Sequence, residues 1–145
     1  MTSISGKMTK KTAPLFLILL STVMVFALTA CSSKTAVTAS DFQSAAENLG
    51  YTVLDITDQY AAYEQINICL AFEDEDLHVE FFEISDEDQA TSFFNVNKET
   101  FESFKGSGAV ETTVNVGSHQ KYTLKTNETY YVVERVGTTT IYSYS

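Results

Sequence analysis

The side chains of this sequence best suited to chemistry are two cysteines, Cys31 and Cys69, and two histidines, His78 and His119. A cysteine beside a histidine can act as a nucleophile with its base. Cys69 lies between apolar residues, however, and no adjacent basic residue would lower the pKa of its thiol. We therefore expect Cys69 to be a small buried core residue. A Cys69–His78 pair across a hairpin and an intermolecular disulfide stay open as alternatives.

Metal sites are the second kind of chemistry to test. Zinc sites use spacings such as C-x-x-C or H-E-x-x-H, and neither pattern occurs. Acidic residues gather at 73–76 and 86–88, but counting from Asp74 places Val79 where a calcium loop has glycine. We expect a solvated turn and a helix start there, with weak divalent binding left open. The sequence predicts no metal and no other cofactor.

Tyrosines gather in the last third of the sequence, at Tyr122, Tyr130, Tyr131, Tyr142 and Tyr144. Tyrosine combines ring area with a hydroxyl and is common on binding surfaces, although it also favours strands through packing alone. Tyr142 and Tyr144 alternate with Ile141, which we expect to face the helices. We therefore predict a candidate binding face on the uncovered side of the sheet, formed by Tyr142, Tyr144 and Tyr131.

The first thirty residues form a targeting segment rather than part of the fold. Three lysines precede an uncharged apolar run of 16 residues, at 13–28, and the sequence Leu-Thr-Ala-Cys ends at Cys31. The run is shorter than the roughly 20 residues of a membrane-spanning helix. This N-terminus resembles the signal peptide and lipobox of bacterial lipoproteins. The resemblance implies cleavage before Cys31, a diacylglycerol on its thiol, and a domain held by that lipid on the outer side of the cell membrane.

The net charge of the chain excludes one class of binding partner. The chain has a formal net charge of −10, and 44% of its residues are hydrophobic, as in a packed globular domain. All 19 acidic residues follow Cys31, leaving −13 on the segment after the predicted cleavage. Nucleic-acid surfaces need clustered Lys and Arg, so we expect no nucleic-acid partner. Residues 31–39 are small and polar and read as a tether, followed by one domain at 40–145.

Two helices are predicted in that domain. Residues 41–49 have apolar side chains at helical spacing, with Ser40 as N-cap and Gly50 after the end. Residues 86–105 follow Ser85 as N-cap, and acidic residues fill the first turn, where the helix dipole favours them. The predicted apolar face of this second helix consists of Ala90, Phe93, Phe94, Phe101 and Phe104.

Strands are predicted at 51–57, 64–72, 77–84, 110–116, 120–126, 129–136 and 139–144. In the second of these, the alternation places Ile66, Ile68, Leu70 and Phe72 on one face. The fold predicted is α+β, an antiparallel sheet with two helices on one face, in the order α-βββ-α-ββββ. This order is similar to PepSY-type and β-lactamase-inhibitor-type α/β repeats. The stretches GYTVLDIT and FFEISDEDQATSFF resemble small clostridial-type lipoproteins of unassigned function.

No catalytic motif accompanies these features. The sequence therefore favours a non-enzymatic, lipid-anchored extracytoplasmic binding module, whose partner is an envelope protein or a small ligand. The alternative is a cell-surface hydrolase, which would need a cleft with convergent polar groups. A binding module needs only an exposed apolar or aromatic patch.

Overall fold

The helices and strands form in the order that their hydrophobic periods predict. The computed structural model describes residues 34–145, and its α+β class and order α-βββ-α-ββββ confirm the prediction. The elements are α2 (Ala39–Asn48), β1 (Leu54–Asp55), the 3-10 helix η1 (Thr57–Tyr60), β2 (Ile66–Asp74), β3 (Leu77–Ile84), α3 (Glu87–Ser103), β4 (Val110–Val116), β5 (His119–Lys125), β6 (Tyr130–Val136) and β7 (Thr139–Tyr144).

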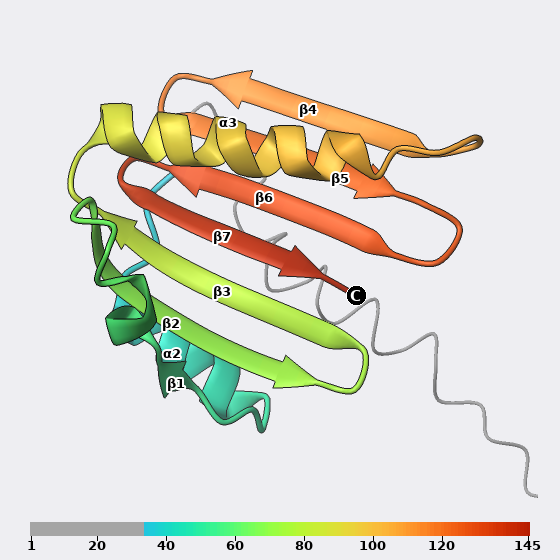
Figure 1. The fold of residues 1–145 in the computed structure, drawn as a ribbon. Helices are drawn as coiled ribbons and strands as arrows, with labels where there is room; N and C mark the ends of the chain where they lie inside the picture. The colour runs from blue at the N-terminus through green and yellow to red at the C-terminus, as the bar shows by residue number, and fades with distance from the viewer. Residues whose placement is uncertain (1–33) are drawn as a thin grey trace, which may run out of the picture. The chain divides into compact units, whose positions relative to one another are not determined.

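All seven strands join one antiparallel sheet in the order β1-β2-β3-β7-β6-β5-β4. After β3 the chain crosses the sheet through α3 and reaches the far edge at β4 (Figure 1). It then returns by consecutive hairpins, so that β7 lies between β3 and β6. The two edges of the sheet are therefore β1 and β4.

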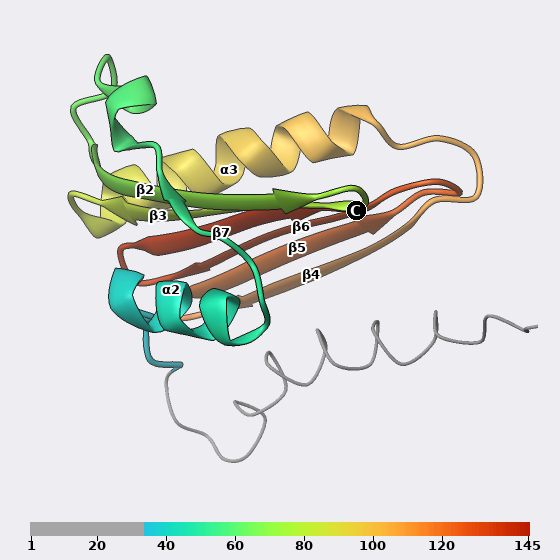
Figure 2. The same cartoon turned by 90° about the horizontal axis from the view of Figure 1, so that it is seen from below.

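The two helices cover opposite faces of the sheet, so the prediction that both lie on one face is wrong (Figure 2). On one side, Phe42 of α2 packs with Leu70 and Phe81. On the other side, α3 packs with two clusters. One holds Cys69 and Phe82, and the other is built from Phe94, Phe101, Tyr122, Leu124 and Val133.

The hydrophobic pattern of β2 and β3 explains why the helices lie on opposite faces. A strand buried on one face alternates apolar and polar residues, whereas a strand buried on both faces is apolar throughout. In β2 the four consecutive residues 69–72 are all buried. In β3 the neighbours Phe81 and Phe82 are both buried. The continuous apolar run therefore reports a helix on each face.

Each helix begins at a different residue from the one predicted. The N-cap of α2 is Thr38, whose hydroxyl accepts a hydrogen bond from the amide of Asp41 at 3.1 Å. The N-cap of α3 is Asp86, whose carboxylate accepts one from the amide of Gln89 at 2.8 Å. Both capping residues have extended backbone, which ends the helix on their N-terminal side.

The C-terminal end of α3 also differs from the prediction. The helix ends at Ser103, with Phe104 as its C-cap, rather than at 105. Phe104 is 48% exposed and does not join the buried face with Phe94 and Phe101. Its ring instead lies 5.3 Å from that of Tyr131. A side chain predicted to be core is therefore a surface aromatic.

Two strands are shorter or less regular than their patterns suggest. β1 contains only Leu54–Asp55, because the Asp55 carboxylate accepts hydrogen bonds from the amide and hydroxyl of Thr57 and turns the chain into η1. In β2 the register shifts between Ile66 and Ile68. This irregularity places Ile66 with the α3-side cluster, so it does not share a face with Leu70 as predicted.

The helices leave part of one face without a helical cover. α3 contacts β3, β5, β6 and β7, whereas α2 contacts only β2 and β3. On the α2 side, the strands β4–β6 therefore have no described helix above them. Among residues 34–145, neither helix combines the length and apolar character needed to cross a bilayer.

Candidate functional site: an aromatic row beside α3

The three tyrosines singled out by the sequence lie together on one face of the sheet. Tyr131 of β6 is the register partner of Tyr144 in β7, and Tyr142 lies two residues before Tyr144 on the same side. Their face is the one covered by α3, so their predicted place on an uncovered side is wrong. Ile141 does pack under a helix, as predicted, but that helix is α2. The tyrosines point to the other face, and the error arose because that face is covered by α3 rather than open.

Four rings form a continuous line along this face, which we call the aromatic row: His78, Tyr144, Tyr131 and Phe104. The ring centroids of His78 and Tyr144 are 4.9 Å apart, those of Tyr144 and Tyr131 are 6.4 Å apart, and those of Tyr131 and Phe104 are 5.3 Å apart. Tyr144 is 39% exposed, and the row ends at Phe104, which is about half exposed. These separations are typical of interacting aromatic pairs.

Tyr142 lies beside this row, under α3, rather than in it. Its ring stacks on Phe101 of α3 at 4.9 Å and meets Tyr144 edge-on at 6.0 Å. Burial, with smaller contributions from Tyr144 and the Glu80 carboxylate, raises the pKa of Tyr142. Tyr142 therefore contacts Tyr144 from under α3, and of these two tyrosines Tyr144 is the one that a partner can touch.

A polar network adjoins the His78 end of the row. The Glu80 carboxylate accepts a hydrogen bond from the Tyr60 hydroxyl at 3.1 Å and lies 3.0 Å from His78 Nε2. The other imidazole nitrogen, Nδ1, is 3.6 Å from the exposed Glu73 carboxylate. The imidazole is thus held between two carboxylates, which fixes the ring plane against which Tyr144 stacks.

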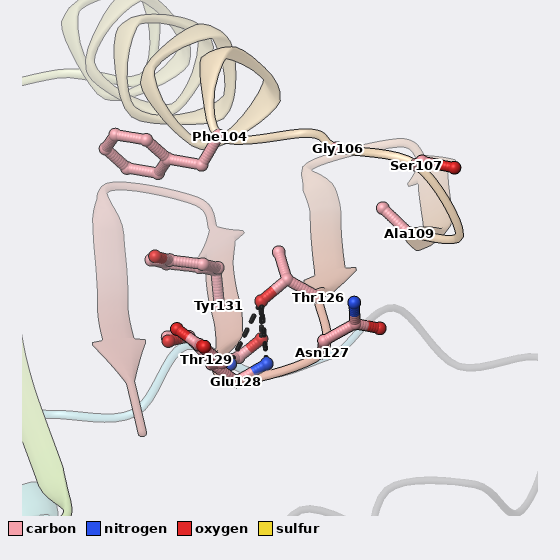
Figure 3. Close-up of a pocket in the computed structure, with 9 residues that line it drawn as sticks. All are labelled: Phe104, Gly106, Ser107, Ala109, Thr126, Asn127, Glu128, Thr129 and Tyr131. Carbon is pink, nitrogen blue, oxygen red and sulfur yellow. Dashed lines mark hydrogen bonds between the residues drawn. The ribbon is translucent and has the colours of Figure 1, made fainter.

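An open pocket adjoins the Phe104 end, between the end of α3 and the β5–β6 turn (Figure 3). Its cavity volume is about 460 Å³. The rings of Phe104 and Tyr131 form one wall, and residues 106–109 and 126–129 supply the rest. Since Tyr131 belongs to both the row and the pocket, the two features form one continuous surface.

The β5–β6 turn that lines this pocket is closed by a backbone hydrogen bond from the Thr126 amide to the Thr129 carbonyl at 2.9 Å, and the Thr126 side chain adds three more. The Thr126 hydroxyl accepts hydrogen bonds from the amides of Glu128 and Thr129, at 3.3 and 3.0 Å, and donates to the Thr129 carbonyl at 3.1 Å. The tip residues Asn127 and Glu128 are exposed. The pocket rim therefore carries an amide and a carboxylate on a preformed turn.

Cys69 does not take part in this surface. Its side chain is fully buried, and burial, with contributions from Glu80 and Asp55, raises the pKa of the thiol to about 12. In the register of β2 and β3, Cys69 lies opposite Phe82, whereas His78 lies opposite Glu73. The alternative Cys69–His78 pair across the hairpin is therefore not formed, and Cys69 is the small core residue that the sequence predicted.

A second polar cluster, which the sequence analysis missed, lies on the other face of β6. The Glu134 side chain is buried, yet it contacts Lys34, His119 Nε2 at 2.9 Å and Lys121 Nζ at 3.2 Å. Burial alone would raise the pKa of Glu134, but the hydrogen bond from Lys34 and the charge of Lys121 outweigh it and lower the pKa. The sequence does contain a signal for this cluster, because Glu134 is an acidic residue inside an apolar strand and a lysine lies on the neighbouring strand of the hairpin.

This cluster has a structural role in joining the start of the described chain to the sheet. Lys34 precedes α2 by a few residues, and 34–38 have no regular secondary structure. Its ammonium binds the Glu134 carboxylate in the middle of β6. The amide of Ala39 donates to Glu83 Oε1 at 3.1 Å. These two contacts hold residues 34–39 on the sheet.

Cys31, the predicted lipid attachment point, lies outside the described residues. Glu73–Asp76 spans the β2–β3 turn, and Asp86–Asp88 caps and begins α3. In the described range, 34–145, no group of three or more His, Cys, Asp or Glu side chains is arranged to hold a metal ion.

Comparison with known proteins gives no relative from which an activity could be transferred. No protein-family model, no curated protein and no solved structure matches this chain.

Proposed function

We propose that this protein is a binding module, anchored by a lipid on Cys31 to the outer side of a bacterial membrane, and that it captures its partner on the aromatic row. The lipobox and the apolar segment before it support the anchor. The aromatic row supports the binding role, and it is the observation that carries the proposal. Exposed rings on a rigid sheet offer contact area with little loss of side-chain entropy on binding.

The chemistry of the surface indicates what would bind there. The rings of His78 and Tyr144 stack on each other, as do those of Tyr131 and Phe104, so the row presents a line of ring edges. Such a line fits a partner with an apolar or aromatic surface. Carboxylates flank the row at both ends, Glu73 near His78 and Glu128 at the pocket rim. These acids favour neutral or cationic groups beside the apolar contact and disfavour anionic ones. The partner is therefore an envelope protein or a small ligand with a ring-sized apolar face and no excess of negative charge.

The pocket supports binding rather than hydrolysis. Its lining contains one carboxylic acid, Glu128, which lies at an exposed turn tip. Hydrolytic sites combine several convergent polar groups of which at least one has an environment that tunes its pKa. The lining of this pocket offers ring faces and a threonine-ordered turn instead.

Capture from native membranes tests the proposal. Detergent-solubilised envelope is passed over the lipidated wild type, the double variant Phe104→Ser/Tyr144→Ser, and Tyr130→Ser. The double variant removes the two most exposed rings of the row. Tyr130 is 44% exposed and points to the opposite face of β6, so its variant is a matched control. We expect the same partner with wild type and Tyr130→Ser, and at least a tenfold loss with the double variant. Equal capture by all three proteins would show that the row is not the binding site.

A further inference from the structure

β4 is a free edge of the sheet, and its composition does not protect it. Among the described residues 34–145 it pairs only with β5, over the seven residues Val110–Val116. Natural sheets blunt exposed edges with lysine, proline, bulges or very short strands. β4 has none of these: its only charged residue is Glu111, and its register with β5 is continuous. The opposite edge, β1, is two residues long.

The β4–β5 turn shows which backbone groups of β4 are free. Gly117 has a φ of 59° and forms a two-residue turn with Ser118, closed by the pair Val116 and His119. Closing residues of such a turn direct their amide and carbonyl groups toward each other, and the direction alternates along the strand. Glu111, Thr113 and Asn115 therefore direct their amides and carbonyls away from β5, toward the open edge.

The sequence of β4 is complementary to itself in antiparallel orientation. With Thr113 on a two-fold axis, Val110 lies opposite Val116 of a second copy, and Glu111 lies opposite Asn115. The remaining opposite pair is Thr112 with Val114. No like charges face each other, and Val110 and Val116, which are 62% and 70% exposed, cover one another. In this register the outward amides and carbonyls of residues 111, 113 and 115 all find partners.

We propose that β4 is a homodimerisation edge, and that two copies join into one continuous 14-stranded sheet through antiparallel β4–β4 pairing about Thr113. A two-fold axis between antiparallel strands is perpendicular to the sheet and makes the interface isologous. The occupant of the edge is thus a second copy of this chain.

The charge distribution favours this edge over the other. The acidic turn at 73–76 belongs to the β2–β3 hairpin, near the β1 edge. Near β4, Glu111 forms an ion pair with Lys105, and Lys121 and Lys125 lie on the adjacent strand β5. Two copies meeting at β4 therefore bring together the ends of the molecule where acidic and basic groups are balanced, although the net charge of each copy is strongly negative.

The position of Lys34 makes the same geometry compatible with a membrane anchor, a point that rests on the proposed function. Glu134, to which Lys34 binds, is opposite Lys121, which is opposite Val114. Cross-strand partners share a face, so Lys34 binds on the face that carries Val110 and Val116. In the two-fold dimer, both Lys34 residues lie on the same face of the joined sheet, which is compatible with two lipid anchors in one bilayer.

Cysteine cross-linking tests the register directly. In the proposed dimer the two Thr113 Cα atoms form a hydrogen-bonded pair about 5.5 Å apart, within the range of a disulfide. The two Asn115 residues are offset by roughly 13 Å along the strands, which is too far. Full-length lipidated Thr113→Cys in phosphatidylcholine vesicles should give a disulfide dimer on oxidation, at least tenfold more than Asn115→Cys or the parent with buried Cys69. Equal cross-linking of the two variants, or none in either, would overturn the proposal.

A backbone change tests the same edge without cysteine. The Thr113 amide points away from β5, so Thr113→Pro leaves the β4–β5 ladder intact and removes a donor at the dyad. We expect wild type and Thr113→Val to show concentration-dependent dimers by sedimentation, and Thr113→Pro to be monomeric with an unchanged melting temperature. A folded proline variant that still dimerises would contradict the pairing. If this variant does not fold, the cysteine pair decides. The same measurements on the Cys31→Ser background separate failure of pairing from failure of anchoring.

Discussion

Phe81 and Phe82 are consecutive residues of β3, and both are buried, one against α2 and the other on the α3 side. Neighbouring side chains of a strand point to opposite faces. This pair therefore places β3 at the centre of three layers, with α2 and its loops below and α3 above. The stability of the sheet depends on both helices, and the surfaces left over by them are the aromatic row and the uncovered half of the α2 side.

The buried face of α3 should dominate its contribution to stability. Phe94 is 2% exposed and packs with Tyr122 and Leu124, whereas Glu99 is exposed on the same helix. Phe94→Ala is expected to lower the free energy of unfolding by about 3–5 kcal/mol. Glu99→Ala should change it by less than about 0.5 kcal/mol. Urea titration followed by circular dichroism measures both, and equal midpoints would contradict the assigned face.

Tyr142 and Tyr144 should contribute differently to the stability of the fold, although they lie on one strand and one face. The Tyr142 ring stacks on Phe101, and its removal leaves a gap under α3. Tyr142→Ser should therefore cost about 2–4 kcal/mol. Tyr144→Ser removes a ring that is partly in solvent and should cost less than about 1 kcal/mol. Thermal unfolding of the two variants distinguishes a supporting ring from a contact ring.

Glu134 should make the stability depend on pH in the acidic range. Its pKa in the folded protein is lower than the ordinary value of 4.5. A lowered folded pKa gives stability that is fully present above the ordinary value and is lost as the pH falls through the lower one. Glu134→Gln should be about 1–3 kcal/mol less stable than wild type at pH 7. The difference should shrink below pH 4.5. A constant difference between pH 7 and pH 3 would show that the charge of Glu134 is not responsible.

The Cys69 thiol should be unreactive in the native protein. Burial raises its pKa to about 12, so the thiolate, which is the reactive form, is scarce at pH 8. Iodoacetamide should leave Cys69 unmodified under native conditions and alkylate it fully in 6 M guanidinium. Mass spectrometry of the Cys69 peptide measures both. Rapid native alkylation would show that the β2 core opens readily.

Cys31→Ser tests the proposed anchor. The wild type is expected to yield a product that begins at Cys31 and carries the added mass of a diacylglycerol. The variant should accumulate as a precursor without that mass, because the modified thiol is absent. Intact-mass measurement of membrane fractions decides. A wild-type protein that carries no lipid and still begins at Met1 would end the claim of lipid anchoring.

Element order could be predicted from the sequence because it depends on local periods and caps. The apolar spacing of α3 and the paired apolar runs of β2 and β3 indicate their own conformations. The sequence also holds a signal for which face of the sheet each helix covers. The adjacent phenylalanines Phe81 and Phe82 mark a strand that is covered on both sides. The alternation of the last strand did group Tyr142 with Tyr144.

Other features depend on contacts between distant segments and lay beyond a local pattern. That β7 pairs with β3 follows from the crossover through α3, which no local pattern in either strand reveals. The ion pair between Lys34 and Glu134 joins residues a hundred positions apart. The exposure of Phe104 depends on where α3 ends, and its spacing alone predicted burial. The aromatic row was therefore only half visible in the sequence, through its tyrosines.

The place of β7 has a consequence for how the protein is made. It is the seventh strand to be synthesised, yet it lies between β3 and β6 and is the only strand that joins the β1–β3 block to the β4–β6 block. Until β7 emerges, the two blocks can be connected only through the α3 segment. A chain that is still being synthesised therefore cannot complete its sheet. The topology therefore delays final folding until the last strand is free.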